Sequence, residues 1–203
     1  TGQGIFMLAN GLLGTLEAHF GSSPMLFLSE LSDVAPYSQH APYQSGTGDY
    51  GGADTKNALA AVTKYTSLSH QPAQAVHATQ LAIKHALSGE RGPVGVLYHS
   101  SCFAGTVDPN QRPYLYPTSR YLPTPQSGNE ADVQAAARAL LAAERPVIIA
   151  GNGVRISRAF DQLARLAAQI GAPVATTASG KGVIAETDDL ALGVCGNFGQ
   201  DAA

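Results

Sequence analysis

The stretch RPVIIAGNGVRISRAFDQLARLAAQIGAPVATTASGKG, residues 145–182, decides the fold class of this 203-residue chain. An apolar run at 146–150 ends in Gly-Asn-Gly, an amphipathic segment follows at 157–170, and a second apolar run covers 173–177. Two short apolar runs joined by a helical segment are typical of a βαβ unit, in which the strands are parallel. The sequence therefore predicts an α/β fold in this half.

The same alternation of strands and helices occurs in the first half of the chain. We expect strands at 24–29, 65–69 and 93–98, helices at 5–19 and 72–87, and a short helix after Asp54. The 5–19 segment is apolar nearly all round, which predicts a helix buried between layers. The fold class predicted from both halves is two parallel-sheet, doubly wound (Rossmann-like) units, both incomplete.

Five prolines between residues 105 and 128 interrupt this alternation. Each proline also restricts the residue before it, so the segment is predicted to be extended. Asn129 is expected to cap the next helix. The apolar face expected for that helix consists of Val133, Ala136, Ala137, Leu140 and Leu141. The predicted organisation is one unit over 1–105, a linker over 106–129 and a second unit over 130–203.

Composition excludes several classes of partner. The net charge is −3, only 13% of residues are charged, and no run of Lys or Arg occurs, so neither nucleic acid nor a membrane is expected as a partner. Two cysteines far apart in sequence fit neither a zinc site nor a disulfide scaffold, which favours a cytoplasmic location. Because the chain begins with Thr1 and shows no signal peptide, we expect a piece of a longer protein.

The Gly151-Asn152-Gly153 turn has two interpretations. It follows a predicted strand, where the backbone N–H groups of open α/β folds bind phosphates, and a side chain there would hold a pyrophosphate away. However, Ile156 stands where a dinucleotide fingerprint has its third glycine. A second loop of small residues at 176–182 would face the same edge. The turn is therefore either a nucleotide site or only the turn of a βα unit.

Two further features are candidates for function. The segment 33–54 is rich in Tyr, Ser, Gln, Gly and Asp, and long loops in compact domains are commonly functional. His99 ends a predicted strand at the edge where cofactors bind, so it is a candidate site residue. His77 and His85 lie on a predicted helix without metal-ligand partners and are expected in surface or capping roles.

Residues 131–203 resemble the start of the central domain of thiamine diphosphate enzymes of the acetolactate synthase type. The resemblance lies in LLAAERPVIIAGNGV and GAPVATTASGKGVIAETDDLALGVCGNFG. The first half resembles the later part of that family's pyrimidine-binding domain, through TGQG, SSPMLFLS, GERGPVGVLYH and GTGDYGGADTKNALAAVTKYT. The resemblance covers almost the whole chain.

The resemblance implies roles for particular residues. Gly2 and Gly4 belong to the turn at the thiamine diphosphate, and Tyr50, Gly51 and Gly52 belong to the loop that approaches the substrate. In that loop the acetolactate synthases carry Phe-Gln-Glu, so acetolactate formation is in doubt. The residues implied at an FAD, or at an equivalent site without flavin, are Gly151, Asn152, Gly153, Thr176, Thr177, Gly180, Lys181 and Gly196.

The resemblance also implies what lies outside these residues. The family's catalytic Glu precedes the position of Thr1, and the Gly-Asp-Gly and Asn that hold Mg²⁺ follow the position of Ala203, so no catalytic or metal-binding residue is expected within the chain. We expect a segment, not competent alone, of a homodimeric or homotetrameric lyase or transferase that acts on a 2-oxo acid. The alternative is a non-catalytic nucleotide-binding or scaffold module of the same fold.

Overall fold

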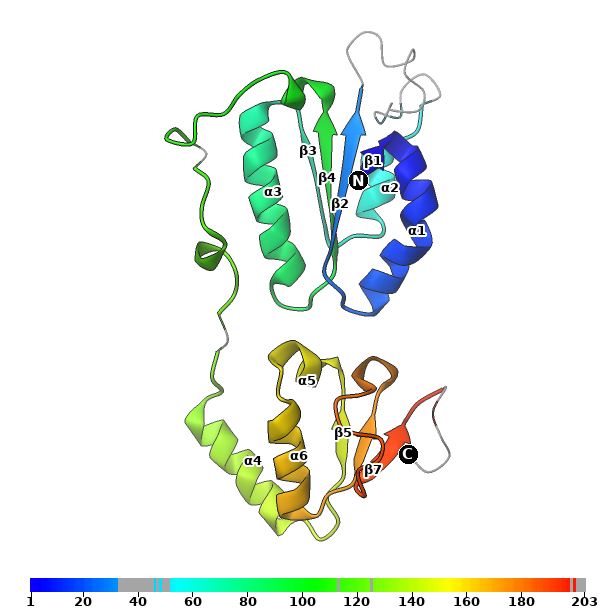
Figure 1. Ribbon diagram of the computed structural model, residues 1–203, viewed down its shortest axis with the longest axis vertical. Helices are drawn as coiled ribbons and strands as arrows, with labels where there is room; N and C mark the ends of the chain where they lie inside the picture. The colour runs from blue at the N-terminus through cyan, green and yellow to red at the C-terminus, as the bar shows by residue number, and fades with distance from the viewer. Residues whose placement is uncertain are drawn as a thin grey trace. The chain divides into compact units, whose positions relative to one another are not determined.

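The computed structural model describes residues 1–32, 46, 48, 52–112, 114–124, 126–197 and 199. The chain divides into two compact units, Thr1–Thr124 and Pro125–Ala203, so the boundary falls inside the predicted linker. Each unit contains a sheet of parallel strands with helices packed on it (Figure 1). The prediction of two parallel α/β units is confirmed.

The first unit is built on four parallel strands in the order β1-β2-β4-β3. Their bounds are β1 Gly2–Gln3, β2 Met25–Leu31, β3 Tyr65–Ser69 and β4 Pro93–His99. The helices are α1 Gly4–Phe20, α2 Thr55–Ala60 and α3 Pro72–Leu87, followed by the short 3₁₀ helices η3 Ser100–Phe103 and η4 Thr118–Arg120. The three longer predicted strands, the short helix after Asp54 and the 72–87 helix are confirmed to within a few residues, whereas β1 was not predicted.

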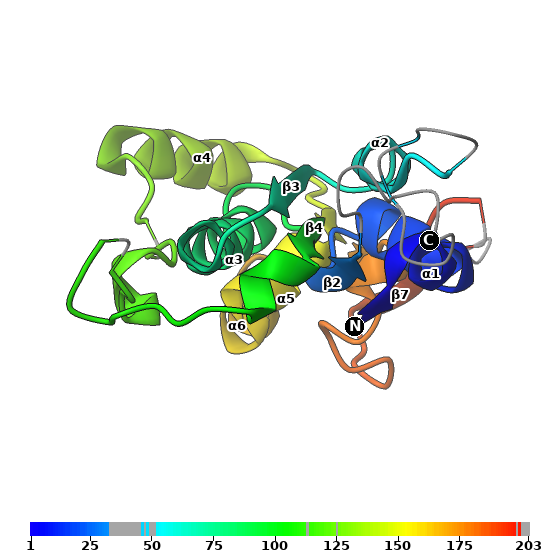
Figure 2. The ribbon, with the colours of Figure 1, turned by 90° about the horizontal axis from the view of Figure 1, so that it is seen from above.

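Helices cover both faces of this sheet (Figure 2). Val94 and Val96 of β4 pack with the alanines of α3, while Leu97 packs with Leu8 of α1 and Leu59 of α2. Successive side chains of a strand point to opposite faces, so one buried strand serves two cores. This double burial explains why β4 reads as a continuous apolar run.

The expectation that helix α1 is buried between layers is wrong for the part of the chain that the structure describes. Leu13 is 74% exposed, Phe20 is 81% exposed and Phe6 is 52% exposed, and they occupy the outer side of the helix. Leu8 and Ala18 are buried on the inner side. Apolar composition predicted that both sides would be covered, but only the tertiary structure shows which side faces this unit's core.

The second unit has three parallel strands in the order β5-β6-β7. Their bounds are β5 Ile148–Ala150, β6 Val174–Thr176 and β7 Ala191–Val194, and the helices are α4 Glu130–Ala142, α5 Asn152–Ser157, α6 Phe160–Ile170 and the 3₁₀ helix η5 Ala178–Gly180. Leu163 and Ala167 of α6 pack on Ala150 and Val174 to form the core. Strand β7 was not predicted.

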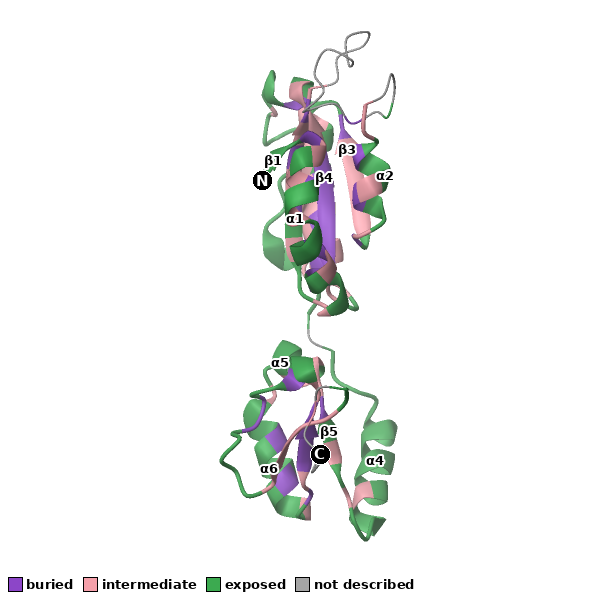
Figure 3. Cartoon of the chain, turned by 90° about the vertical axis from the view of Figure 1, so that its right-hand side faces the viewer, coloured by how far each residue is buried: buried purple, intermediate pink, exposed green. Residues whose placement is uncertain are grey.

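Two helices of this unit differ from expectation. The helix predicted over 157–170 is α6, which begins three residues later, and the turn before it contains the unpredicted helix α5, which ends where Arg158 adopts a left-handed conformation with φ 55°. Helix α4 begins as predicted, with the Asn129 side chain accepting from the Ala131 N–H at 2.9 Å. None of its residues is buried, and Val133 and Leu141 of its apolar face are 53% and 78% exposed (Figure 3).

Part of the proline-rich segment is attached to helix α3. The Gln80 side chain donates from Nε2 to the Tyr114 carbonyl and accepts from the Tyr116 N–H, both at 3.0 Å. The side-chain amide of Gln80 thus satisfies one backbone carbonyl and one backbone N–H of the segment, as a paired strand would do. None of the helices in the described ranges is long and apolar enough to cross a membrane.

Candidate functional site

The carboxyl ends of the first unit's parallel strands meet at one edge of the sheet. Strand β2 ends at Leu31, β3 at Ser69 and β4 at His99, and Leu31 is the register partner of His99. Ligands of open α/β folds bind outside this edge. The residues that follow each strand at this edge therefore form the candidate site.

The turn at Gly2 and Gly4 lies beside the end of β2. Gly2 pairs with Ser29, and the Ser29 hydroxyl donates to the Gly4 carbonyl at 3.3 Å. Gly4 opens helix α1 with φ 50°, a left-handed conformation that side chains rarely adopt. The structure thus brings the predicted cofactor turn to the carboxyl edge, and its role in binding stays a prediction.

The predicted substrate loop is only partly within the described residues. Tyr50 and Gly51 lie outside them, whereas Gly52 is described and half-buried just before α2. Gly46, earlier in the same segment, packs so closely on Leu31 that a Cβ there would stand 2.8 Å from its methyl groups. The described part of the loop therefore borders the end of β2.

Helix η3 ties three strand ends together. The Ser100 hydroxyl donates to the Leu31 carbonyl at 3.1 Å, the Ser101 hydroxyl donates to the His70 carbonyl, and the Cys102 thiol donates to the Ser69 carbonyl at 3.1 Å. These bonds satisfy carbonyl groups where the β ladders end. Sequence reasoning missed this arrangement, although three small polar side chains directly after a strand were a visible signal.

Two imidazoles lie side by side at this edge. The ring centroids of His70 and His99 are 5.3 Å apart and the rings are tilted by 38°. His99 Nδ1 lies 2.7 Å from the Ser101 hydroxyl oxygen. Sequence reasoning singled out His99 but not His70, because the pairing of β3 with β4 brings them together across 29 residues of chain.

Two neighbouring groups have shifted pKa values. Burial raises the pKa of the Cys102 thiol, and burial also raises the pKa of the Tyr98 hydroxyl, which is hydrogen-bonded to Thr79 at 2.7 Å. Both groups are therefore neutral near neutral pH. They add no negative charge beside the imidazoles.

The second unit presents its own carboxyl edge, where the Gly151 and Thr176 loops follow adjacent parallel strands, as predicted. The Thr177 N–H donates to the Ala150 carbonyl at 3.0 Å, and the Cys195 N–H donates to the Thr176 carbonyl at 2.8 Å. The loops after β5, β6 and β7 are thus bonded to one another. Gly151 and Asn152 do not form a free turn, because α5 begins at Asn152.

The predicted nucleotide residues at this edge fall into two groups. Gly180 and Thr177 are packed inside the edge: the Gly180 N–H donates to the Thr177 hydroxyl at 3.1 Å. By contrast, a Cβ at Gly153 or Gly196 would meet nothing within 4 Å, so their backbone faces open space. Lys181 forms an exposed ion pair with Glu186 at 2.9 Å.

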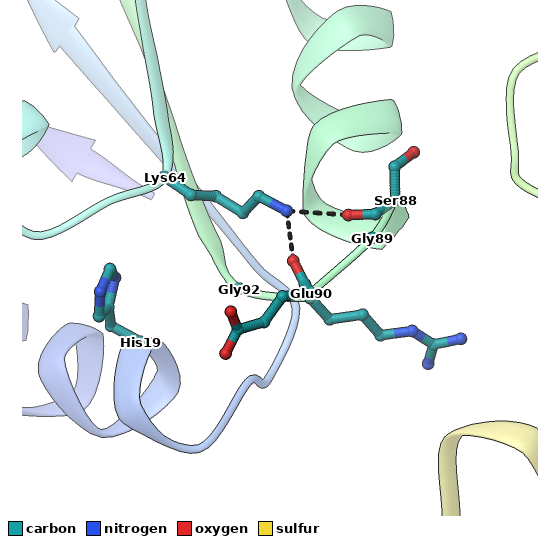
Figure 4. A pocket seen from close by; sticks show the side chains of 7 residues that line it. His19, Lys64, Ser88, Gly89, Glu90 and Gly92 are labelled. Carbon is teal, nitrogen blue, oxygen red and sulfur yellow. Dashed lines mark hydrogen bonds between the residues drawn. The ribbon is translucent and has the colours of Figure 1, made fainter. Parts of the chain in front are cut away.

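A cavity of about 310 Å³ lies at the opposite, amino edge of the first sheet, between the C-terminal ends of α1 and α3 (Figure 4). The Lys64 ammonium donates to the Ser88 carbonyl at 2.9 Å and to the Glu90 carbonyl. Lys64 thus neutralises the negative end of α3. The described residues contain no cluster of three or more His, Cys, Asp or Glu side chains that could hold a metal ion.

The class of protein defined by these features is an open α/β protein with small-residue loops at the carboxyl edges of two parallel sheets. The family model described as "Thiamine pyrophosphate enzyme, central domain" matches residues 133–203. Residues 133–203 therefore belong to the central-domain family of thiamine diphosphate-dependent enzymes, and the chain is similar to an acetolactate synthase large subunit over nearly its whole length.

Individual relatives agree with this assignment. A probable acetolactate synthase large subunit of Methanocaldococcus jannaschii is 31% identical over 197 residues, which cover 96% of this chain and 32% of the relative. Oxalyl-CoA decarboxylase of Escherichia coli strain K12 is 28% identical over 194 residues, covering 93% of this chain and 32% of the relative. The acetolactate synthase large subunit of Haemophilus influenzae is 27% identical over 195 residues, covering 94% and 32%. The chain spans about a third of the length of these relatives.

Proposed function

We propose that the chain is part of an enzyme that uses thiamine diphosphate to form or break the carbon–carbon bond beside the carbonyl of a 2-oxo acid. The observation that carries the proposal is similarity to such enzymes over 93–96% of the chain. Relatives named for both acetolactate synthesis and oxalyl-CoA decarboxylation make carboligation and decarboxylation the two candidate reactions.

The turn at Gly2–Gly4 supports a site for the cofactor. The Ser29 hydroxyl fixes the Gly4 carbonyl, and the first turn of α1 carries no acidic residue that would compete for its N–H groups. When bound, thiamine diphosphate supplies the carbanion chemistry, and the protein supplies orientation and electrostatics. We assign Gly2 and Gly4 to holding the pyrimidine end, and Gly52 with the preceding Tyr50 and Gly51 to the substrate side.

The remaining parts of the reaction are proposed to come from outside these residues. In this proposal the glutamate that activates the cofactor and the Mg²⁺ ligands belong to other parts of the complete enzyme. The test is turnover of pyruvate and of oxalyl-CoA by the complete enzyme with thiamine diphosphate and Mg²⁺, compared with the 203-residue chain. The proposal is supported if the complete enzyme turns over one of these substrates and the 203-residue chain does not. Turnover without thiamine diphosphate, by the complete enzyme or by the chain, would contradict it.

A second candidate function is nucleotide binding without catalysis, with FAD as the ligand suggested by the resemblance. The open space beside Gly153 and Gly196 favours it, because a pyrophosphate needs close approach to the backbone. Gly153→Val is a suitable probe, since a Cβ at this position would meet nothing within 4 Å and the side chain would occupy that space. Saturable quenching of FAD fluorescence that this substitution abolishes supports the site, whereas no quenching at high micromolar FAD contradicts it.

We further propose that the complete protein is a cytoplasmic homodimer or homotetramer. The outer side of α1 supports the oligomer, because Phe6, Leu13 and Phe20 are exposed and spaced seven residues apart. A seven-residue apolar stripe is how a helix packs along another helix. Both cysteines are free, which is compatible with a reducing compartment.

A further inference from the structure

The row of residues that ends the first sheet contains two imidazoles on one face. Leu31 and His99 are register partners, and His70 follows Ser69, the register partner of Tyr98. Register partners in parallel strands share a face, and His70 lies one residue beyond Ser69 just as His99 lies one residue beyond Tyr98, so Leu31, His99 and His70 form one row. Leu31 packs with α1 and α2, so this row lies on the face of the sheet that these helices cover. Gly46, which precedes the predicted substrate loop, packs against Leu31 on the same face.

The hydrogen bonds of Ser101 define the protonation of His99. The Ser101 hydroxyl has one proton, and its contact with the His70 carbonyl requires that proton, because a carbonyl cannot donate. The 2.7 Å contact between Ser101 Oγ and His99 Nδ1 must then be donated by Nδ1–H. The Ser101 backbone N–H lies 3.3 Å from Nδ1 and can donate to that nitrogen only in the other tautomer; the 2.7 Å contact is the shorter of the two and sets the tautomer. In that tautomer Nε2 is the ring nitrogen that can bind a ligand.

The strand ends themselves carry no permanent positive charge. Neither Lys nor Arg occurs in residues 29–32, 67–71 or 97–103. A 2-oxo acid brings a carboxylate to this edge, and buried or half-buried carboxylates need a charged partner. Among these residues, only the two imidazoles can become positive.

We propose that the protonated imidazolium of His99 binds the carboxylate of the substrate, with its Nδ1–H bonded to Ser101 and with His70 beside it. This inference rests on the proposed function, since it assumes that the substrate is a 2-oxo acid. The carboxylate binds and Nε2 takes up one proton from solvent, so no bond within the substrate changes. His99 thereby selects an anionic substrate at strand ends that contain neither Lys nor Arg.

The surrounding groups are compatible with this role. Helix α2 contributes Asp54 and Lys56 on the same side of the sheet, and the Asp54 carboxylate already accepts from the Asn57 N–H and side-chain amide. Glu30 precedes Leu31 and therefore points to the opposite face, as does Tyr98. The Cys102 thiol is neutral. The backbone N–H of His70 donates to the Gln74 side-chain oxygen at 3.0 Å.

The proton uptake gives the site a pH dependence of known sign. Because a carboxylate favours the imidazolium over the neutral imidazole, binding is coupled to proton uptake and affinity is highest at acidic pH. In the pH range where the free imidazole is neutral, affinity falls by up to tenfold per pH unit. A site made of Lys or Arg would show no such change in this range.

The experiment is calorimetric titration of the complete protein with oxalate, a carboxylate that resembles a 2-oxo acid, at about pH 6 and about pH 8. We expect affinity at least tenfold weaker at the higher pH. His99→Gln should weaken binding at the lower pH and remove the pH dependence, and Ser101→Ala should weaken binding less. His77→Gln, which removes an exposed imidazole on α3, is the matched control and should bind as the wild type.

Three outcomes overturn the proposal: equal oxalate affinity at both pH values, wild-type affinity of His99→Gln, or inorganic phosphate binding as tightly as oxalate at the same edge. Circular dichroism of each variant checks folding, and Ser101→Ala, which keeps the imidazole, tests the site independently of His99→Gln. The titration needs no turnover. Absence of thiamine diphosphate-dependent activity would therefore refute the proposed function without changing the oxalate result.

Discussion

Gly180 and Ala150 approach so closely that a Cβ at position 180 would stand 2.3 Å from the Ala150 carbonyl oxygen. The same carbonyl accepts from the Thr177 N–H, so this contact joins the ends of β5 and β6. In this position glycine is required for packing within the protein, whatever ligand the edge binds.

Gly180→Ala is expected to destabilise the second unit by about 2–3 kcal/mol, because backbone atoms on both sides must move to admit the methyl group. Urea denaturation followed by circular dichroism measures the change. Gly153→Ala is the matched control: its methyl group meets nothing within 4 Å and lies in a helix, where alanine is favoured. Equal stability of the two variants would show that the edge tolerates a side chain at 180.

Lys64→Met should lower the unfolding free energy of the first unit by about 1 kcal/mol. The substitution keeps the apolar stem and removes the ammonium that bonds the Ser88 and Glu90 carbonyls. Lys56→Met, an exposed substitution in the first turn of α2, serves as the control for loss of one charge. Urea denaturation measures the unfolding free energy of each variant. Equal values for the two variants would show that Lys64 does not stabilise the end of α3.

Gln80→Leu is expected to release the segment around Tyr114 and Tyr116 from α3, because leucine replaces both the donor and the acceptor of the amide. Hydrogen exchange at the Tyr116 N–H should become faster, by about tenfold for each 1.4 kcal/mol of lost protection. Gln80→Glu keeps the acceptor for that N–H and should show the smaller change. Unchanged exchange in Gln80→Leu would contradict the attachment.

Leu13→Glu should lower the oligomeric state of the complete protein, since it places a charge in the middle of the exposed stripe of α1. Light scattering after size-exclusion chromatography measures the mass. Lys84→Glu, an exposed substitution on α3, should leave the mass unchanged. An unchanged mass in Leu13→Glu would indicate that another part of the same polypeptide covers the helix.

Cys102 should react with a thiol reagent more slowly than Cys195 near neutral pH. Cys102 is 7% exposed and burial raises its pKa, so its thiolate fraction is small, whereas Cys195 is half-buried. Reactivity of Cys102 should increase as pH rises toward its pKa. The rate of thiol modification is measured in Cys195→Ala, which retains Cys102, and in Cys102→Ala, which retains Cys195. Faster reaction of Cys102 would refute this explanation.

The sequence by itself determined the local elements of the fold. Strand β3 at Tyr65–Ser69 and helix α3 at Pro72–Leu87 match the predicted ranges, because apolar periodicity and the proline and glycine signals act over a few residues. The family could also be predicted, since the motifs at 151–154 and 176–182 are contiguous stretches of sequence.

Only the tertiary structure decided which side chains meet. His70 and His99 become neighbours because β3 pairs with β4 in a particular register, and no local pattern encodes that register. Likewise, an apolar helix such as α1 is predicted from its residues, but which side remains exposed depends on where the other elements pack. Short-range preferences of the chain fix its helices and strands, whereas contacts between residues distant in sequence depend on how those elements assemble.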